Sequence, residues 1–244
     1  MSQRIFRRAL SMGALLLLVV GVSGFATRAN AADQAEINKR IDSSARVLNE
    51  IMATPDKSIP DKLMQDAKCI AVIPGMLKVA FGVGGSHGKG FATCRTDNGW
   101  SAPAPIQITG GSWGLQLGGQ AVDLVMIVTN DQGMQHLLSD KFKIGADASA
   151  AAGPVGRNAA ADTDWKMKAE VVTYSRAKGI FAGIDLNGSS ITQDKGDTRA
   201  LYGGDVPFPE ILNGKETAPQ SSEPFLAAVR KYTSEAREAN AAGK

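Results

Sequence analysis

The pattern of apolar and polar residues divides the chain into a helical beginning, a β-rich middle and a helical end. In residues 33–54, apolar side chains recur at spacings of three and four: Ile37, Ile41, Ala45, Leu48 and Met52. This spacing places them on one face of a helix, which Thr54-Pro55 ends. Pro60 then predicts a short helix over 61–67, with the proline at or near its first turn.

From Cys69 to about residue 192 the sequence is typical of β-structure. Short runs rich in Val and Ile, broken by Gly, Pro and Asn-Gly signals, predict strands over 69–73, 77–83, 91–95, 106–117, 121–129, 170–175 and 179–186. Three sequences predict hairpin turns: Ser86-His87-Gly88-Lys89, Asp97-Asn98-Gly99 and Asn187-Gly188. We expect an antiparallel sheet curled into a barrel or a sandwich, with glycines inside strands marking bends or close backbone approach.

Helical patterns return within and after the β-rich region. They cover 132–138, 197–201, 209–212 and 223–237. The last of these would bury Phe225, Val229 and Tyr232, whereas the small-residue run 145–156 cannot be classified by periodicity. The predicted fold class is α+β, a curved antiparallel β-barrel or sandwich core with flanking N- and C-terminal helices. No linker is long enough to divide it, so we expect a single domain over 32–244.

Residues 1–31 have the pattern of an export signal. The segment begins with three basic residues, Arg4, Arg7 and Arg8. The apolar stretch 14–24 follows, and Ala29-Asn30-Ala31 supplies an A-x-A pattern with cleavage expected before Ala32. The stretch is short and Gly-rich for a membrane span; an uncleaved anchor is the alternative. We therefore expect an exported, periplasmic or envelope-associated protein without a transmembrane helix in its mature chain.

The net charge of the protein depends on whether residues 1–31 are removed. The whole chain has 27 Lys and Arg against 24 Asp and Glu, a formal charge of +3, and its 43% of hydrophobic residues is enough for a core. The export segment holds four arginines and no acid, so its removal takes the 27 basic residues to 23, against 24 acidic. Attraction to an acidic partner must then come from local clusters of Lys and Arg rather than from the bulk charge.

The two cysteines, Cys69 and Cys94, both lie in the expected mature chain. In an oxidising compartment an even pair favours a disulfide. This one would close a loop of about 25 residues and contribute roughly 3 kcal/mol in the chain-entropy model. The alternative is two buried thiols in adjacent strands, because two cysteines alone do not establish the geometry of a bridge.

Motifs of enzyme chemistry are incomplete in this sequence. Gly110-Gly111-Ser112-Trp113-Gly114 matches G-x-S-x-G, but a nucleophile elbow needs a helix after its serine, and the residues that follow have the pattern of a strand. Residues 84–90 (GGSHGKG) lack the first glycine and the final hydroxyl residue of a phosphate loop. His87 and His136 are too far apart in sequence for a zinc motif. We expect no enzyme, no cofactor and no metal, and an esterase acting through Ser112 is the weakest hypothesis.

Basic residues beside glycines or apolar residues are the remaining candidates for binding. They are Lys78, Lys89, Lys141, Lys143 and Arg157. Gathered on one face, such residues would attract anionic headgroups at about 1 kcal/mol each. The alternative is a set of scattered, solvated charges, and the residues alone favour it.

Six segments, in order, carry a more specific pattern. They are AKCIAVIPG (67–75), FGVGGSHGKGFATCR (81–95), GGSWGLQLGGQAVDLVMIV (110–128), KIGADASAAAGPVGR (143–157), TYSRAKGIFAGIDLNGSSI (173–191) and ALYGG (200–204). Together they resemble the SYLF domain, also called the Ysc84 or DUF500 family, with the match strongest over 67–205. With its export signal, the chain resembles a bacterial exported member of that family.

The resemblance implies a non-catalytic lipid-binding module. Eukaryotic relatives bind phosphoinositides and are linked to membrane remodelling and actin patches. For an exported chain we expect anionic phospholipid or another envelope lipid as the partner, and neither actin nor nucleic acid. An amphipathic helix, over 33–54 or at the C-terminus, would present apolar area while nearby Lys and Arg bind headgroups. The alternative is an envelope structural or protein-interaction module without a lipid ligand.

Overall fold

The structure is a computed structural model of the 244-residue chain. It describes residues 33–54, 59–139, 141–153, 169–177, 180–181 and 186–242. The expected export signal and Arg157 lie outside the described residues.

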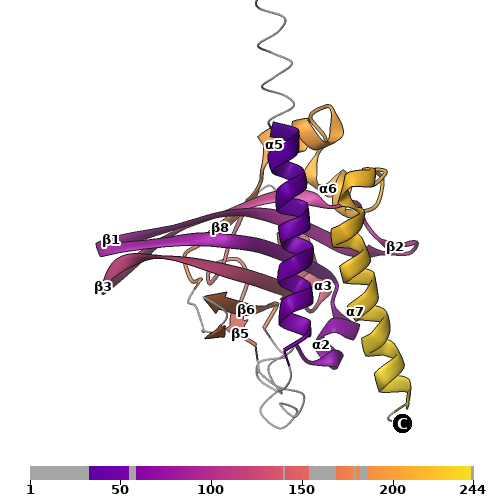
Figure 1. Cartoon of the computed structure of the whole chain (residues 1–244), viewed down its shortest axis with the longest axis horizontal. Coiled ribbons are helices and arrows are strands. Elements are labelled where there is room, and N and C mark those ends of the chain that lie inside the picture. Colours follow the sequence, from indigo (N-terminus) through magenta and orange to yellow (C-terminus); the bar gives the residue numbers. More distant parts are fainter. Residues whose placement is uncertain are drawn as a thin grey trace, which may run out of the picture.

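A curled sheet is covered on one face by two long helices (Figure 1). The N-terminal helix spans residues 33–52, and α7 (Glu223–Ala242) crosses the same face. The short helix α2 (Asp61–Asp66) follows the first of them and begins after Pro60, as its sequence predicts. Mixed α+β architecture with helices at both ends is confirmed.

The longest elements of the sheet are two strands that pair along most of their length. β1 (Cys69–Thr96) and β3 (Ala104–Val128) form an antiparallel ribbon, in which Cys69 lies opposite Val128 and Ala92 opposite Ala104. Its register shifts between Ile73 and Met76 and again between Ala80 and Gly82. β2 (Gly99–Trp100) pairs with the end of β1 across Asp97-Asn98, which confirms the turn predicted there.

The ribbon doubles back, so that the two ends of β1 meet. A straight strand would separate Cys69 from Cys94 by about 80 Å, but their Cα atoms are 4.0 Å apart and a disulfide joins them, as predicted. The backbone approach is close near this end. A Cβ on Gly90 would lie 2.0 Å from the carbonyl oxygen of Val72, a separation that only glycine avoids.

The hairpin turn predicted at Ser86-His87-Gly88-Lys89 is wrong. These residues lie inside β1 and stay paired with β3, Ser86 opposite Gly110 and Lys89 opposite Gln107. The predicted strands 106–117 and 121–129 are likewise one strand. A glycine-rich segment can bend while its ladder continues, and the ladder satisfies backbone groups that a tight turn would leave to solvent.

The remaining strands complete the sheet around this ribbon. They are β4 (Lys141–Lys143), β5 (Ala150–Ala152), β6 (Val171–Ala177), β7 (Ile180–Phe181) and β8 (Ser190–Gln193). β6 pairs with the end of β3, while β8 pairs with the start of β3 and with β4. Asn187-Gly188 is a turn, with Gly188 at a φ of 79°, and among the described strands β8 pairs with β3 and β4. Most of the strand predicted before this turn lies outside the described residues.

The other predicted helices are confirmed with small shifts of their ends. They are α3 (Asp131–Leu138), α5 (Lys195–Tyr202) and α6 (Phe208–Leu212), followed by the 3-10 turn η2 (Gln220–Ser222). Two apolar clusters occupy the two faces of the sheet. One lies under the long helices and includes Ile41 and Phe225, and the other includes the disulfide and Ile73.

Candidate functional site

The two long helices do not present apolar area to solvent, which corrects the expected binding mechanism. Ile37, Ile41 and Leu48 of the N-terminal helix are buried against the sheet, as are Phe225 and Val229 of α7. The apolar stripe that made each helix amphipathic in sequence is therefore used in the core. Any apolar contact with a lipid has to come from another element.

Apolar side chains are exposed instead on β1. Among the described residues, the large hydrophobic side chains that are exposed are Leu77, at 55%, and Val79, at 43%. They lie just beyond Pro74-Gly75, where the register of the ribbon shifts. Gly75 has a φ of 59°, a conformation that glycine adopts readily and other residues rarely do.

The register shift determines which face these two side chains share. Before the shift, Val72 packs under the long helices and Ile73 packs on the opposite face. After it, Met76 joins Ile73 on that opposite face. Leu77 and Val79 therefore lie on the face that the helices cover, yet both are exposed. The β1–β3 ribbon extends past the N-terminal helix (Figure 1).

A groove lies on this same face, between the N-terminal helix and the sheet. Its volume is about 670 Å³, and its walls are Ala35, Glu36, Lys39, Arg40, Ser43, Arg46, Pro74, Gly75 and Asp123. Asp123 comes two residues after Ala121, which is the ladder partner of Leu77. The groove and the exposed apolar residues are thus neighbours on one face of the sheet.

Two of the three cations in the groove are not balanced by close carboxylates. Arg40 is paired with Glu36 at 2.9 Å and with Asp197. In contrast, Lys39 is exposed and has no ion-pair partner among the described residues. Arg46 donates to the Ser43 hydroxyl at 3.2 Å, and its nearest carboxylate, at 4.0 Å in an exposed pair, contributes little.

The acidic wall of the groove, by contrast, is neutralised. Asp123 accepts hydrogen bonds from Arg176 at 3.0 Å and from the backbone N–H of Gly75 at 3.0 Å. The hydrogen bond from Gly75 also holds the bend of β1 against β3. The groove therefore offers free positive charge, and an anion is the ligand that this charge favours.

The lysines predicted from sequence lie at separate places. Lys78 is half-buried between Leu77 and Val79, and Lys141 and Lys143 are exposed on β4. None of these lysines lines the groove. Their role as lipid contacts stays a prediction, as does that of Arg157, which is outside the described residues.

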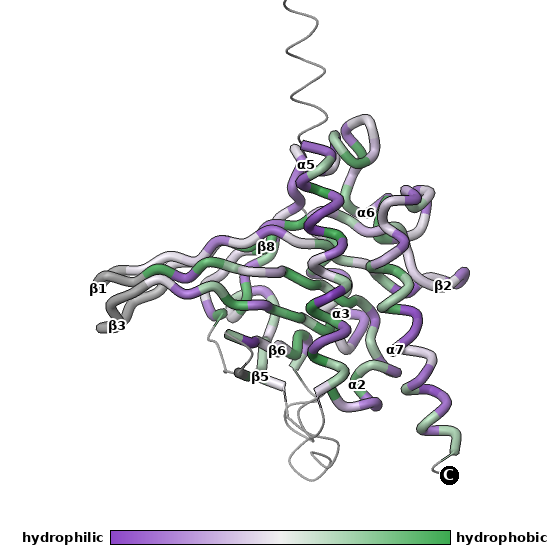
Figure 2. The backbone as a smooth tube through the Cα atoms, viewed as in Figure 1, coloured by the Kyte–Doolittle hydropathy of each residue, from purple (hydrophilic) through white to green (hydrophobic). Residues whose placement is uncertain are grey.

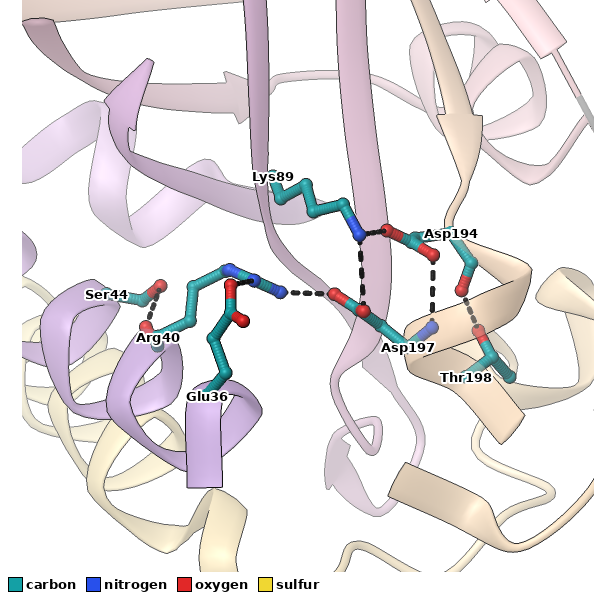
Figure 3. A network of polar contacts seen from close by, with 7 residues as sticks. All are labelled: Glu36, Arg40, Ser44, Lys89, Asp194, Asp197 and Thr198. Carbon is teal, nitrogen blue, oxygen red and sulfur yellow. Dashed lines mark hydrogen bonds and ion pairs between the residues drawn. The ribbon is translucent and has the colours of Figure 1, made fainter. Parts of the chain in front are cut away.

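Lys89 belongs to a partly buried polar network (Figure 3). Its ammonium lies 2.6 Å from Asp194 and 3.3 Å from Asp197, and Asp197 also binds Arg40 of the N-terminal helix. Burial alone lowers the pKa of Lys89, but the hydrogen bond to Asp194 and the charges of both carboxylates outweigh it and raise that pKa. The charge of Lys89 is already balanced, and the network fastens α5 to β1 and to the helix that forms the groove.

Asp194 has a second role in this network. Its carboxylate accepts the N–H of Asp197 at 3.0 Å and so caps the start of α5. Burial raises the pKa of Asp194, but the hydrogen bonds from Lys89 and from the Asp197 backbone outweigh burial and lower it.

Sequence reasoning missed Lys39, Ser43 and Arg46. Their spacings of four and three place them on one face of the N-terminal helix, beside the apolar stripe that was recognised. That polar face was a usable signal. Nothing in the sequence, however, placed the bend at Pro74-Gly75 opposite to it, and that bend forms the second wall.

The G-x-S-x-G sequence lies in a different backbone context from a nucleophile elbow. β3 runs without interruption through Gly110–Gly114 to Val128, so that no helix follows Ser112. The interpretation of this sequence as a glycine-containing strand is confirmed. Within the described residues, no helix has the length and apolar character that crossing a membrane requires.

Comparison with known protein families places the chain in one of them. The family model for Ysc84, described as "Las17-binding protein actin regulator", matches residues 109–232. The chain belongs to the Ysc84 family. The resemblance to the SYLF domain is thereby confirmed, and the match extends beyond ALYGG (200–204), the last of the six segments, to residue 232.

Several eukaryotic proteins are similar to this Ysc84-family chain. The SH3 domain-containing YSC84-like protein 1 of Bos taurus is 33% identical over 181 residues, which cover 73% of this chain and 53% of the relative. Protein YSC84 of Saccharomyces cerevisiae is 32% identical over 175 residues, covering 70% and 37%. The chain thus spans about half the length, or less, of these curated relatives. They are named for SH3 domains or as YSC84, and not as enzymes.

Proposed function

We propose that this Ysc84-family protein is a non-catalytic module that binds the surface of membranes containing anionic phospholipid. The observation that carries the proposal is the groove beside the N-terminal helix, where Lys39 and Arg46 leave positive charge unbalanced next to exposed apolar residues. Anionic headgroups attract such cations, and apolar side chains beside them add contact with the acyl boundary. The chain also resembles the SYLF domain, whose eukaryotic members bind phosphoinositides, and this resemblance supports anionic lipid as the ligand class.

We further propose that residues 1–31 direct export and that residues 32–244 form one domain in the cell envelope. The basic start, the apolar stretch and Ala29-Asn30-Ala31 support this. The intact mass of protein recovered from the envelope of its host should match a chain beginning at Ala32. A mass that includes residues 1–31 would show an uncleaved anchor instead.

Vesicle sedimentation tests the lipid proposal. Mature protein should sediment with phosphatidylcholine vesicles that contain phosphatidylglycerol and remain in solution with phosphatidylcholine alone, and binding should weaken as salt rises. The double variant Lys39→Ala with Arg46→Ala should bind about thirtyfold more weakly, since each cation near an anionic surface contributes about 1 kcal/mol.

A matched control removes the same charge elsewhere. Lys215 and Arg237 are exposed and lie outside the groove, so Lys215→Ala with Arg237→Ala should leave binding nearly unchanged. Equal losses in the two double variants would mean that bulk charge, and not the groove, determines binding. No sedimentation of wild-type protein with anionic vesicles at low salt would refute the lipid proposal.

A protein-interaction module is the second candidate function. It is favoured by the description of the family as a Las17-binding actin regulator and by the SH3 domains in the names of relatives. This function predicts that a stable protein partner co-purifies with the mature chain in the absence of lipid. Sedimentation with filamentous actin tests one such partner directly, and we expect no actin binding by an exported protein.

A further inference from the structure

The far part of the β1–β3 ribbon carries an apolar surface that the fold does not use. We call it the ribbon strip and define it as Leu77 and Val79 of β1 with Ala121, the exposed ladder partner of Leu77 on β3. The long helices cover the base of this same sheet face, but the ribbon extends past them (Figure 1). In Figure 2 hydrophobic residues continue along the strands into this uncovered part.

The sequence of the ribbon is unusual in its charges. No Asp or Glu occurs in residues 67–96 or 98–122, whereas the first of these ranges holds Lys68, Lys78, His87, Lys89 and Arg95. Beyond the strip the sequence continues with apolar residues, and the register places Val83 opposite Trp113. The far part of the ribbon carries no carboxylate of its own, the carboxylate of Asp123 at its base is paired with Arg176, and the unbalanced cations Lys39 and Arg46 of the neighbouring groove are attracted to an anionic surface.

These observations favour a membrane over a protein partner as the surface that contacts the strip. Here the strip lies beside the groove that holds the unbalanced cations Lys39 and Arg46, on an element that projects away from the body of the protein (Figure 1). Such an element can reach the boundary of a bilayer before the rest of the molecule makes contact.

We propose that the ribbon strip inserts into the headgroup–acyl boundary of an anionic bilayer while Lys39 and Arg46 bind headgroups at the groove. The inference rests on the proposed function and names the element that enters the lipid. Insertion is shallow, because the outer edges of a two-stranded ribbon carry unpaired backbone groups that hydrocarbon cannot satisfy. The long helices take no part in insertion, since their apolar faces are buried.

A single fluorescent label tests the depth of the strip. Both cysteines of the chain are in the disulfide, so Leu77→Cys provides one free thiol for the environment-sensitive dye NBD. With phosphatidylglycerol vesicles the dye at residue 77 should increase in emission and shift to the blue. Lipids with a spin label near the headgroup should quench it more than lipids labelled near the acyl end. The same dye on Lys215→Cys, an exposed position outside the groove, should not change.

The outcomes separate this inference from the proposed function. Protein that sediments with vesicles while the dye at residue 77 stays in water would overturn insertion and leave lipid binding intact. Protein that does not sediment would overturn both. A dye response that depends on protein concentration without vesicles would show that a second copy of the chain covers the strip, and this too would overturn insertion.

A second variant removes the apolar character without labelling. Leu77→Ser with Val79→Ser should weaken vesicle binding at least about tenfold, because burial of each side chain contributes favourably to transfer from water. Its thermal midpoint should equal that of the wild type, since both side chains are exposed in the folded protein. Unchanged vesicle affinity with an unchanged midpoint would contradict the proposal.

Discussion

The base and the far part of the β1–β3 ribbon follow the same alternating pattern but have opposite environments. At the base, Cys69 and Ile73 are fully buried and the disulfide holds the two ends of β1 together. Beyond Pro74-Gly75, Leu77 and Val79 are exposed, although they lie on the sheet face whose base the long helices cover. The difference shows that alternation in a strand determines which residues share a face, while the elements packed on that face determine whether it is buried.

Alanine substitutions on either side of the bend should show the largest contrast. Ile73→Ala removes a fully buried side chain and should lower the free energy of unfolding by about 2 to 5 kcal/mol. Leu77→Ala should change it by less than about 0.5 kcal/mol, because the side chain is already in solvent. Urea denaturation of both variants measures the two values. Similar losses would mean that the far part of the ribbon is packed like its base.

Glycines in the two regions should also respond differently to an added methyl group. A Cβ at Gly90 would lie 2.0 Å from the Val72 carbonyl oxygen, so Gly90→Ala forces the two parts of β1 apart and should lower stability by about 2 to 3 kcal/mol. A Cβ at Gly119 meets nothing within 4 Å, and Gly119→Ala should be neutral or slightly stabilising in a strand. Thermal unfolding of the pair compares them. Equal midpoints would contradict the close approach at the base.

The smallest expected effect concerns the network that fastens the base of the ribbon to α5. Asp194→Asn keeps an oxygen to cap α5 but removes the charge that pairs with Lys89. At neutral pH it should lower the free energy of unfolding by about 1.5 kcal/mol, the lower end of the range for a hydrogen bond to a charged group, because Lys89 is partly exposed. Chemical denaturation of the variant and the wild type over a series of pH values measures this difference.

The pH dependence of that difference has a defined sign. The pKa of Asp194 is lowered by folding, so its contribution is present above the ordinary value of 3.8 and is lost as pH falls below it. The pKa of Lys89 is raised above 10.5, so its contribution is lost only as pH rises beyond that value. The free energy of unfolding of the wild type should therefore exceed that of Asp194→Asn by a constant amount from about pH 5 to 9. A difference that varies through this range would show that another group titrates with the network.

Local signals predicted much of the fold. The spacing of Ile37, Ile41 and Leu48 predicted both a helix and its buried face, because a helix repeats every 3.6 residues whatever it packs against. Asp97-Asn98-Gly99 predicted a turn for an equally local reason. Ser86-His87-Gly88-Lys89 failed because glycines permit both a tight turn and a bend in a continuous ladder, and the choice depends on the partner strand.

The candidate site was harder to predict than the fold. Lys89 was recognised as a cation, but its partners Asp194 and Asp197 are more than 100 residues away in sequence and convert it from a free charge into a structural one. Lys39 and Arg46 were visible on the polar face of a helix. Such faces are usually solvated, and only the opposing wall at Gly75 makes this one the side of a groove.

The sequence by itself determined the helical faces and the family, because these depend on short-range spacing and ordered motifs; it favoured a disulfide, but the doubling back of the ribbon brought the two cysteines together. Tertiary structure alone decided which apolar residues stay exposed. The apolar faces of the amphipathic helices are buried in the core, while a register shift at Pro74-Gly75 places Leu77 and Val79 on the face that the helices cover, at positions where both stay exposed. Burial is a property of what packs against a residue, and that packing is assembled from parts of the chain that are distant in sequence.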